Sequence, residues 1–337
     1  MKSVRALGRE FAVWRGQDGT VSVFGAYCPH LGANLAIGGI VEDNCLKCPF
    51  HGWRFEKNGE ARDAPGCDKK PYGKADSYLC MERNEMIMIW IDGKRDAPRR
   101  GRGMLSAAAP PEEARWQVPE VALIKSGYQF VGLVEQSITA HIQEIPENGA
   151  DGAHLSVVHA PFVISKLSGW FDHDWLFTWT PAPEDSPEAH TAVVDMKLGM
   201  RIFGKIWDSL LIRVHVTQVG PALVHEILTL PLGLGTIYFA SSVTPVKPLL
   251  LRYTHTMWCS NMLPRFVAKL ILRGLKVQVD RDVPIWNNKM YRHRVPYTSG
   301  DANIPRFRKW FRQFYSEHSE TFQEAMEAER NTLSLEW

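Results

Sequence analysis

The chain has 337 residues, of which 45% are hydrophobic and 23% charged, and its formal net charge is +2. This length allows two domains with separate hydrophobic cores. The near balance of charge excludes the basic surface of a nucleic-acid-binding protein, so we expect no nucleic-acid partner. Six cysteines in a chain this long are too few for the disulfide framework of a small secreted domain.

Residues 1–95 alternate short apolar runs with turn-forming residues, which predicts an all-β domain. The stretch GREFAVWRGQDGTVSVFGAYC indicates two strands joined by a turn at Asp18-Gly19, and EMIMIWIDG, 85–93, indicates the last strand. Residues 96–115, rich in Pro, Gly and charge, are predicted to be a linker. MKSVRALGRE has no apolar signal-peptide core, and because the chain starts directly with a strand, we expect further sequence upstream.

Two loops of this domain carry candidate metal ligands in the pattern C-x-H-x17-C-x2-H, namely Cys28, His30, Cys48 and His51. Two thiolates and two imidazoles suit a structural zinc ion. They also suit a Rieske [2Fe–2S] cluster, in which the cysteines hold one iron and the histidines hold the other. Each loop supplies one ligand of each kind, which favours the cluster, with zinc as the alternative.

Residues 116–337 combine strand and helix patterns, so they predict a second domain with an antiparallel sheet and helices. The strands are expected within 174–181, 191–200, 209–219, 223–232, 235–246 and 251–260, and the helices around 149–160, 263–291 and 305–333. An aromatic stripe in the last helix is predicted to face the core. The fold class is therefore α+β, with an all-β domain first.

The segment ENGADGAHLSVVHAPF, 147–162, contains Asp151, His154 and His159. Two histidines and one carboxylate on one side of an iron leave positions open, as in non-haem Fe(II) oxygenases. Asp151 and His154 share a helix face. His154 and His159 lie about 140° apart on a regular α-helix, so they reach one metal only if the helix widens into a π-type turn or ends between them.

The stretches CPHLGANL and CPFHGW resemble the Rieske domain of ring-hydroxylating oxygenases, and D-x2-H-x4-H resembles the mononuclear iron motif of the same family. The resemblance implies a third iron ligand far downstream, at Asp282 in VQVDRDVPIWNNKMY, with Asp280 as the alternative. It implies that Asp151 instead bridges an iron-ligating histidine to a cluster histidine of a neighbouring subunit. It also implies a head-to-tail homotrimer.

Within this family, CPHLGANLAIGG, IPENGADGAHL and IWNNK resemble the cholesterol 7-desaturase group and, more distantly, the 3-ketosteroid 9α-hydroxylases. A helix-grip-like catalytic domain and conversion of cholesterol to 7-dehydrocholesterol are implied. O₂ is then a substrate, and electrons come from NAD(P)H through a separate reductase, since the chain has no G-x-G-x-x-G. A steroid hydroxylase, or a non-catalytic electron carrier or sterol-binding protein, are the alternatives.

The resemblance further implies a membrane-associated protein facing the cytosol, at the endoplasmic reticulum, with its N-terminal anchor outside this chain. No stretch here is apolar enough to span a bilayer. MLPRFVAKLILRGL, 262–275, fits either a helix at a membrane surface or a core-facing helix. Four further side chains fit either the lining of a sterol cavity or core packing: Tyr238, Phe239, Met257 and Trp258.

Overall fold

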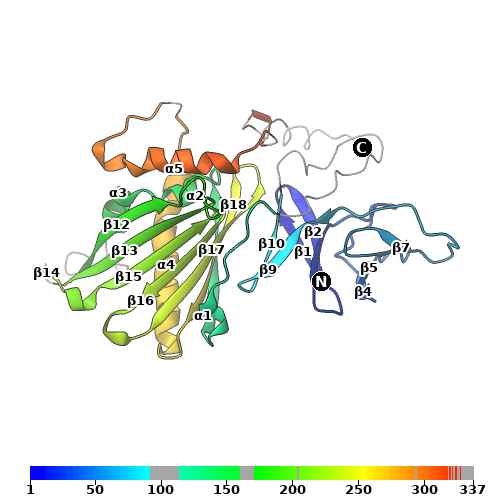
Figure 1. Cartoon of the computed structure of the whole chain (residues 1–337), viewed down its shortest axis with the longest axis horizontal. Coiled ribbons are helices and arrows are strands. Elements are labelled where there is room, and N and C mark those ends of the chain that lie inside the picture. Colours follow the sequence, from blue (N-terminus) through cyan, green and yellow to red (C-terminus); the bar gives the residue numbers. More distant parts are fainter. Residues whose placement is uncertain are drawn as a thin grey trace. The chain divides into compact units, whose positions relative to one another are not determined.

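The computed structural model describes residues 1–91, 114–159, 171–202, 205–292 and 294–317, with a few separate residues beyond 317. These residues fall into two compact units (Figure 1). Unit 1 comprises Met1–Glu120, Val246–Pro248 and Ser316–Trp337, and unit 2 comprises Val121–Pro245 and Leu249–Tyr315. The linker predicted over 96–115 lies almost entirely outside the described residues.

The described part of unit 1 forms β-sheets, and the prediction of an all-β N-terminal domain is confirmed. Its sheets have the strand orders β1-β2-β3-β8, β4-β5-β6-β7 and β10-β9. Their bounds are β1 Lys2–Ala6, β2 Arg9–Arg15, β3 Val21–Gly25, β4 Ile40–Glu42, β5 Cys45–Lys47, β6 Arg54–Phe55, β7 Ala61–Asp63, β8 Ser77–Tyr78, β9 Cys80–Arg83 and β10 Met86–Ile89.

The core of unit 1 follows from the period-two alternation of its strands. Trp14 of β2 and Phe24 of β3 are fully buried and pack edge to face, with ring centroids 5.4 Å apart. The same apolar cluster includes Cys28 and Cys48 from the two ligand loops. The loops are therefore fixed to the core by their cysteines.

Unit 2 is built on an eight-stranded sheet in the order β11-β18-β17-β16-β15-β13-β12, with β14 paired to β13. The six strands predicted from the sequence are present as β12, β13 and β15 to β18, whereas β11 and the two-residue β14 were not predicted. The bounds are β11 Gln129–Thr139, β12 Phe171–Pro181, β13 Thr191–Ile202, β14 Lys205–Ile206, β15 Ile212–Val219, β16 Leu223–Thr229, β17 Thr236–Lys247 and β18 Leu250–Cys259.

The long helix α4, Arg265–Asn287, runs along one face of this sheet (Figure 1). Its buried residues Ala268 and Leu272 pack against Phe239 and Met257 of the sheet. Those two side chains, with Tyr238 and Trp258, are at most 3% exposed, so packing is the role that the structure gives them. Among the described residues, no helix is both long and apolar enough to cross a membrane.

The remaining helical segments are short. They are α1 Ala122–Lys125, α2 Glu144–Glu147, α3 Gly152–His154, the π-helix η2 Leu155–His159, α5 Asn303–Phe311 and the 3₁₀ turns η4 Asp208–Leu210, η5 Pro231–Gly233, η6 Ser299–Asp301 and η7 Arg312–Phe314. The predicted aromatic stripe of α5 and η7 does face the core: Phe307, Trp310, Phe311 and Phe314 pack around Trp179. The helix predicted over 305–333 is shorter than expected, because Tyr315 has extended backbone and ends it.

Candidate metal centres

The two ligand loops of unit 1 have the same main-chain geometry. In the first, the Cys28 N–H donates to the Ala33 carbonyl and the Gly32 N–H donates to the Cys28 carbonyl, both at 2.9 Å. In the second, Cys48 bonds to Trp53 at 2.8 Å and Gly52 bonds back to Cys48 at 3.1 Å. Gly32 and Gly52 take nearly equal positive φ values, +74° and +73°, in the region that glycine occupies at little cost.

Within these loops the cysteines point inward and the histidines outward. Cys28 and Cys48 are buried, whereas His30 and His51 are exposed and their rings are 4.8 Å apart. The Trp53 ring stacks on His30 at 4.7 Å. A pair of thiols at one end and a pair of imidazoles at the other is the ligand division of a Rieske cluster.

The chemistry of the sulfur ligands also fits a bound cation. Burial raises the pKa of the Cys28 thiol to about 11, although the His30 and Leu31 N–H groups hydrogen-bond to the sulfur and oppose the shift. Such a thiol loses its proton at neutral pH when a metal holds the thiolate. The same N–H groups are of the kind that tunes the potential of a cluster.

The spacing of the donor atoms separates the cluster from zinc. One tetrahedral zinc draws its four donors to within about 4 Å of each other. Among the described residues, one set of at least three His, Cys, Asp or Glu side chains has its donor atoms within 4.8 Å of one another. This set lies in unit 2. Cys28, His30, Cys48 and His51 do not form such a set among the described residues, which agrees with ligands divided between two irons.

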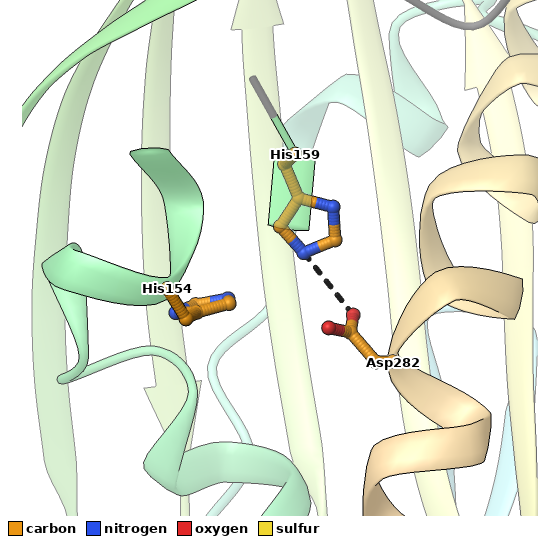
Figure 2. Close-up of side chains that lie close together, drawn as sticks. All are labelled: His154, His159 and Asp282. Carbon is orange, nitrogen blue, oxygen red and sulfur yellow. Dashed lines mark ion pairs between the residues drawn. The ribbon is translucent and has the colours of Figure 1, made fainter. Parts of the chain in front are cut away.

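The compact set in unit 2 consists of His154, His159 and Asp282, brought together from η2, its neighbour α3 and α4 (Figure 2). His159 Nε2 lies 3.2 Å from Asp282 Oδ2. The two imidazole rings are 5.2 Å apart and nearly perpendicular, at 82°. Two imidazoles and one carboxylate converging on one point can hold a non-haem iron with positions left open.

A π-helical turn allows the two histidines to converge. η2 covers Leu155–His159, directly after the short helix α3 that ends at His154. A spacing of five residues exceeds one α-helical turn by about 140°, and the wider π turn returns His159 to the side of His154. The structure thus takes the first of the two arrangements expected from the spacing.

Both histidines are oriented through their Nδ1 atoms. His154 Nδ1 lies against the main-chain carbonyl of Asp151. His159 Nδ1 lies 3.0 Å from Oε1 of Gln278 on α4, an oxygen that also accepts a hydrogen bond from Arg281 at 2.9 Å. With each Nδ1–H donated to an oxygen, each Nε2 keeps its lone pair for a metal. The sequence analysis missed Gln278, whose signal is its position one helical turn before Asp282.

The structure distinguishes Asp282, Asp280 and Asp151, the three carboxylates that the sequence offered near the predicted iron site. Asp282 is 6% exposed and belongs to the compact set, whereas Asp280 is exposed and pairs with Lys276 at 2.6 Å. Asp151 is the N-cap of α3: its Oδ1 accepts from the Ala153 and His154 N–H groups. Its Oδ2 stands 4.0 Å from His154 Nδ1. The geometry therefore places Asp151 beside the set and outside it.

The stretch IWNNK, 285–289, which carried part of the sterol resemblance, ties the end of α4 to its surroundings. Glu144 of α2, which is 5% exposed, pairs with Lys289, just after α4. Asn287 accepts a hydrogen bond from the Thr139 N–H at 2.7 Å, which ties the end of α4 to β11. Trp286 is buried against Tyr253 in the core. These contacts fix the α4 turn that carries Asp282.

Comparison with known proteins assigns this arrangement to a family. Residues 1–79 match the Rieske [2Fe-2S] domain, and residues 104–315 match the 3-ketosteroid 9α-hydroxylase C-terminal domain. The chain is 38% identical to cholesterol 7-desaturase nvd 1 of Ciona intestinalis, over 95% of this chain and 66% of that one. It is 36% identical to cholesterol 7-desaturase nvd of Hemicentrotus pulcherrimus, over 96% and 68%. The chain belongs to the cholesterol 7-desaturase family of Rieske oxygenases.

More distant comparisons agree with this assignment. The probable 3-ketosteroid-9-alpha-monooxygenase oxygenase component of Rhodococcus rhodochrous is 26% identical over 93% of this chain and 75% of that one. The crystal structure of dicamba monooxygenase bound to dicamba shares the fold, with TM-score 0.64 and 17% identity over 97% of this chain and 93% of that one. The chain spans about two thirds of the length of the cholesterol 7-desaturases above.

Family membership confirms the predicted fold class and the prediction of an oxidoreductase with two cofactors. These are a Rieske [2Fe–2S] cluster and a mononuclear non-haem iron. The ligand assignments stay predictions: Cys28, His30, Cys48 and His51 for the cluster, and His154, His159 and Asp282 for the iron. They agree with the donor geometry described above.

Proposed function

We propose that this protein converts cholesterol to 7-dehydrocholesterol. The observation that carries the proposal is the set of His154, His159 and Asp282 in a chain more than a third identical to cholesterol 7-desaturases along most of its length. The reaction removes one hydrogen each from C7 and C8 and, with O₂, two electrons and two protons, yields the new double bond and two waters. NAD(P)H supplies the electrons through a separate reductase.

The residues divide the work between the two centres. The iron supplies O₂ activation when it is bound, and the cluster supplies single electrons. Asp282 and the two Nε2 atoms would hold the iron, and its remaining positions would be open to O₂. Gln278 and the Asp151 carbonyl hold the imidazoles in one tautomer. Desaturation then depends on which C–H bonds the pocket presents.

Product analysis tests the proposal. The protein with both centres loaded is incubated with cholesterol, O₂, NADPH and a Rieske-type reductase, and the sterols are identified by mass spectrometry. We expect loss of two mass units and the ultraviolet absorption of a conjugated diene. Unchanged cholesterol under conditions where the cluster is reduced and reoxidised would contradict the proposal.

A steroid hydroxylase is the second candidate, supported by the match of residues 104–315 to the 3-ketosteroid 9α-hydroxylase C-terminal domain. Use of ¹⁸O₂ separates the two reactions, because a hydroxylase adds labelled oxygen to the steroid and a desaturase adds none. A non-catalytic electron carrier is separated by iron analysis. It would hold two irons per chain, and an oxygenase holds three.

We also propose that the protein works as a homotrimer in which Asp151 connects the cluster of one subunit to the iron of the next. Support comes from the position of Asp151, whose partly exposed side chain touches the backbone of the iron-binding helix. Light scattering of the loaded protein is expected to give three chains per particle. A monomer with full activity would contradict this arrangement.

Contact with a membrane surface is a further part of the proposal, and the support is an apolar stripe at one end of unit 2. Met262, Phe266 and Leu270 follow one another at intervals of four residues and are 72%, 70% and 63% exposed. The loop that carries the exposed residues Leu232 and Leu234 lies beside Met262. Its next residue, Gly235, is so near that a Cβ placed on it would be 3.7 Å from the Met262 Cβ. Such exposed apolar groups are costly in water and suit a lipid interface.

The charges around this stripe select an anionic lipid surface as the partner. Arg265, Lys269 and Arg273 on the same stretch of α4 are exposed, and the chain has no acidic residue between 261 and 279. Cosedimentation with vesicles of phosphatidylcholine and phosphatidylserine is expected for the protein and to be lost in Phe266→Ser/Leu270→Ser. Equal sedimentation of the two proteins would contradict this surface. The protein is thus proposed to be membrane-associated on the cytosolic side of the endoplasmic reticulum.

A further inference from the structure

A row of polar side chains crosses three neighbouring strands of the sheet in unit 2. Ser241 of β17 donates to Glu226 Oε1 of β16 at 3.2 Å, and its Oγ lies 2.7 Å from His255 Nδ1 of β18. Because the single Ser241 O–H is directed to Glu226, His255 Nδ1 must carry a proton and donate to Ser241. Among the described residues, Ser241 is the one hydrogen-bond partner of Glu226.

This row lies on the face of the sheet that α4 covers. Glu226 pairs across the strands with Phe239, which packs against α4, and directly paired residues point to the same face. Ser241 is two residues further along β17, so it points the same way. Apolar core clusters lie on both sides of the row, one around Phe239 and Met257 and the other around Val243 and Trp286.

The iron ligand Asp282 belongs to the same space. Tyr253 of β18 follows this face of the sheet beside His255, with ring centroids 4.1 Å apart. Desolvation first, and then the charges of Glu226 and Asp282, raise the pKa of the Tyr253 hydroxyl. The Tyr253 hydroxyl is therefore near enough to both Glu226 and Asp282 for their charges to affect its pKa. The polar row and Asp282 of α4 therefore lie on the same side of the sheet.

The row has unused hydrogen-bonding capacity. His255 is 1% exposed and its Nε2 has no partner, and one Glu226 oxygen is left unpaired. Burial raises the pKa of Glu226 to about 7, yet the side chain keeps some accessible surface. Unpaired buried polar groups are costly unless a ligand satisfies them.

We propose that Glu226 is the polar anchor of the substrate, accepting a hydrogen bond from the single hydroxyl of an otherwise apolar, polycyclic alcohol. This proposal rests on the proposed function, in which that alcohol is a sterol, and it adds the residue that selects the hydroxyl. The apolar clusters that flank the row match the apolar remainder of such an alcohol. A fixed hydroxyl then determines which ring carbon lies at His154, His159 and Asp282.

Binding measurements test this anchor separately from catalysis. Dissociation constants for cholesterol and for cholest-5-ene, which lacks the hydroxyl, are measured on the protein with both centres loaded. We expect the wild type to prefer cholesterol by at least tenfold and Glu226→Ala to lose this preference while its affinity for cholest-5-ene is unchanged. Glu135→Ala, on the same sheet but exposed at the surface, is the matched control and should keep the preference. Equal weakening of both ligands in Glu226→Ala, or none, would overturn the proposal.

Glu226→Gln keeps the size of the side chain and provides the test if the alanine variant does not fold. A carboxylate repels a ketone oxygen, whereas a carboxamide N–H donates to it. We therefore expect Glu226→Gln to bind cholest-4-en-3-one about tenfold more tightly than the wild type. Unchanged ketone affinity would overturn the anchor. If the wild type prefers cholesterol in binding but forms no 7-dehydrocholesterol, the anchor stands and the proposed function fails.

Discussion

The side-chain oxygen of Gln278 lies 3.0 Å from Nδ1 of His159, on the opposite side of the ring from Asp282, which approaches Nε2 at 3.2 Å. The carboxamide thereby selects the tautomer in which Nε2 faces the metal position. The helix α4 supplies both Asp282, a candidate metal ligand, and Gln278, which orients the second candidate ligand His159. Gln278 and Asp282 lie on the same side of α4 because they are one turn apart.

Replacement of Gln278 by alanine is expected to lower the affinity for the mononuclear iron by about 10- to 100-fold, because the ring of His159 loses its orienting acceptor. Iron analysis and the cluster absorption together measure the result, since the cluster should remain loaded. Lys276→Ala, two residues before Gln278 and solvent-accessible, serves as the control. Wild-type iron affinity in Gln278→Ala would show that the contact does not orient the ligand.

Asp282→Ala should lose the mononuclear iron while keeping the cluster, so the iron content is expected to fall from three to two per chain. Asp280→Ala should retain three irons, because Asp280 is exposed and pairs with Lys276. Metal analysis of both variants measures this difference. A loss of iron in Asp280→Ala alone would reverse the assignment.

Asp151 has two separable roles, and two substitutions distinguish them. Asparagine caps a helix as well as aspartate does, so Asp151→Asn should keep both centres loaded but slow electron transfer between them, because the charge is lost. Asp151→Ala should also reduce the free energy of unfolding by about 1 kcal/mol through loss of the cap. The rate of cluster reoxidation by O₂ with cholesterol present measures the first effect. A wild-type rate in Asp151→Asn would exclude the bridging role.

The matched ligand loops provide a comparison of two glycines. An alanine at Gly32 or Gly52 costs about 1–2 kcal/mol, since both positions require positive φ. A Cβ at Gly52 would also stand 2.9 Å from Pro65, whereas Gly32 has open space. We expect Gly52→Ala to lose more stability and more cluster than Gly32→Ala, as measured by chemical denaturation and visible absorption. Equal losses would mean that Pro65 moves aside without cost.

Acidification should destabilise the protein through His225. This residue is 4% exposed, lies 2.6 Å from the Tyr238 hydroxyl, and burial lowers its pKa to about 4. Because the unfolded chain takes up the proton at higher pH, stability is lost as the pH falls below about 6.5, by about 1 kcal/mol per pH unit. His225→Gln should therefore lose less in melting temperature between pH 7 and 5.5 than the wild type. The exposed His215→Gln should behave as the wild type, and an equal loss in His225→Gln would contradict this explanation.

Much of this arrangement followed from the sequence because it rests on local patterns. Strands β12, β13 and β15 to β18 were predicted from their apolar patterns, and the paired Cys-His loops indicated their cluster without any tertiary information. β11 was not predicted, since a bulge between Phe130 and Gly132 shifts its alternation. The length of the last helix was overestimated, because Tyr315 leaves the helix to bond with Gln143. Glu226 gave no local signal, because its partners lie on other strands, and the only signal of Gln278 was its position one helical turn before Asp282.

The π turn between His154 and His159 has a consequence for how the site responds to change. Rewinding Leu155–His159 into regular α-helix would swing the second imidazole away from Asp282, so metal coordination and main-chain winding vary together. The π conformation of Leu155–His159 permits coordination by both histidines, and an α conformation would prevent it. A metal ion bound by His154, His159 and Asp282 would therefore stabilise the π turn, and its removal is expected to change the winding of Leu155–His159.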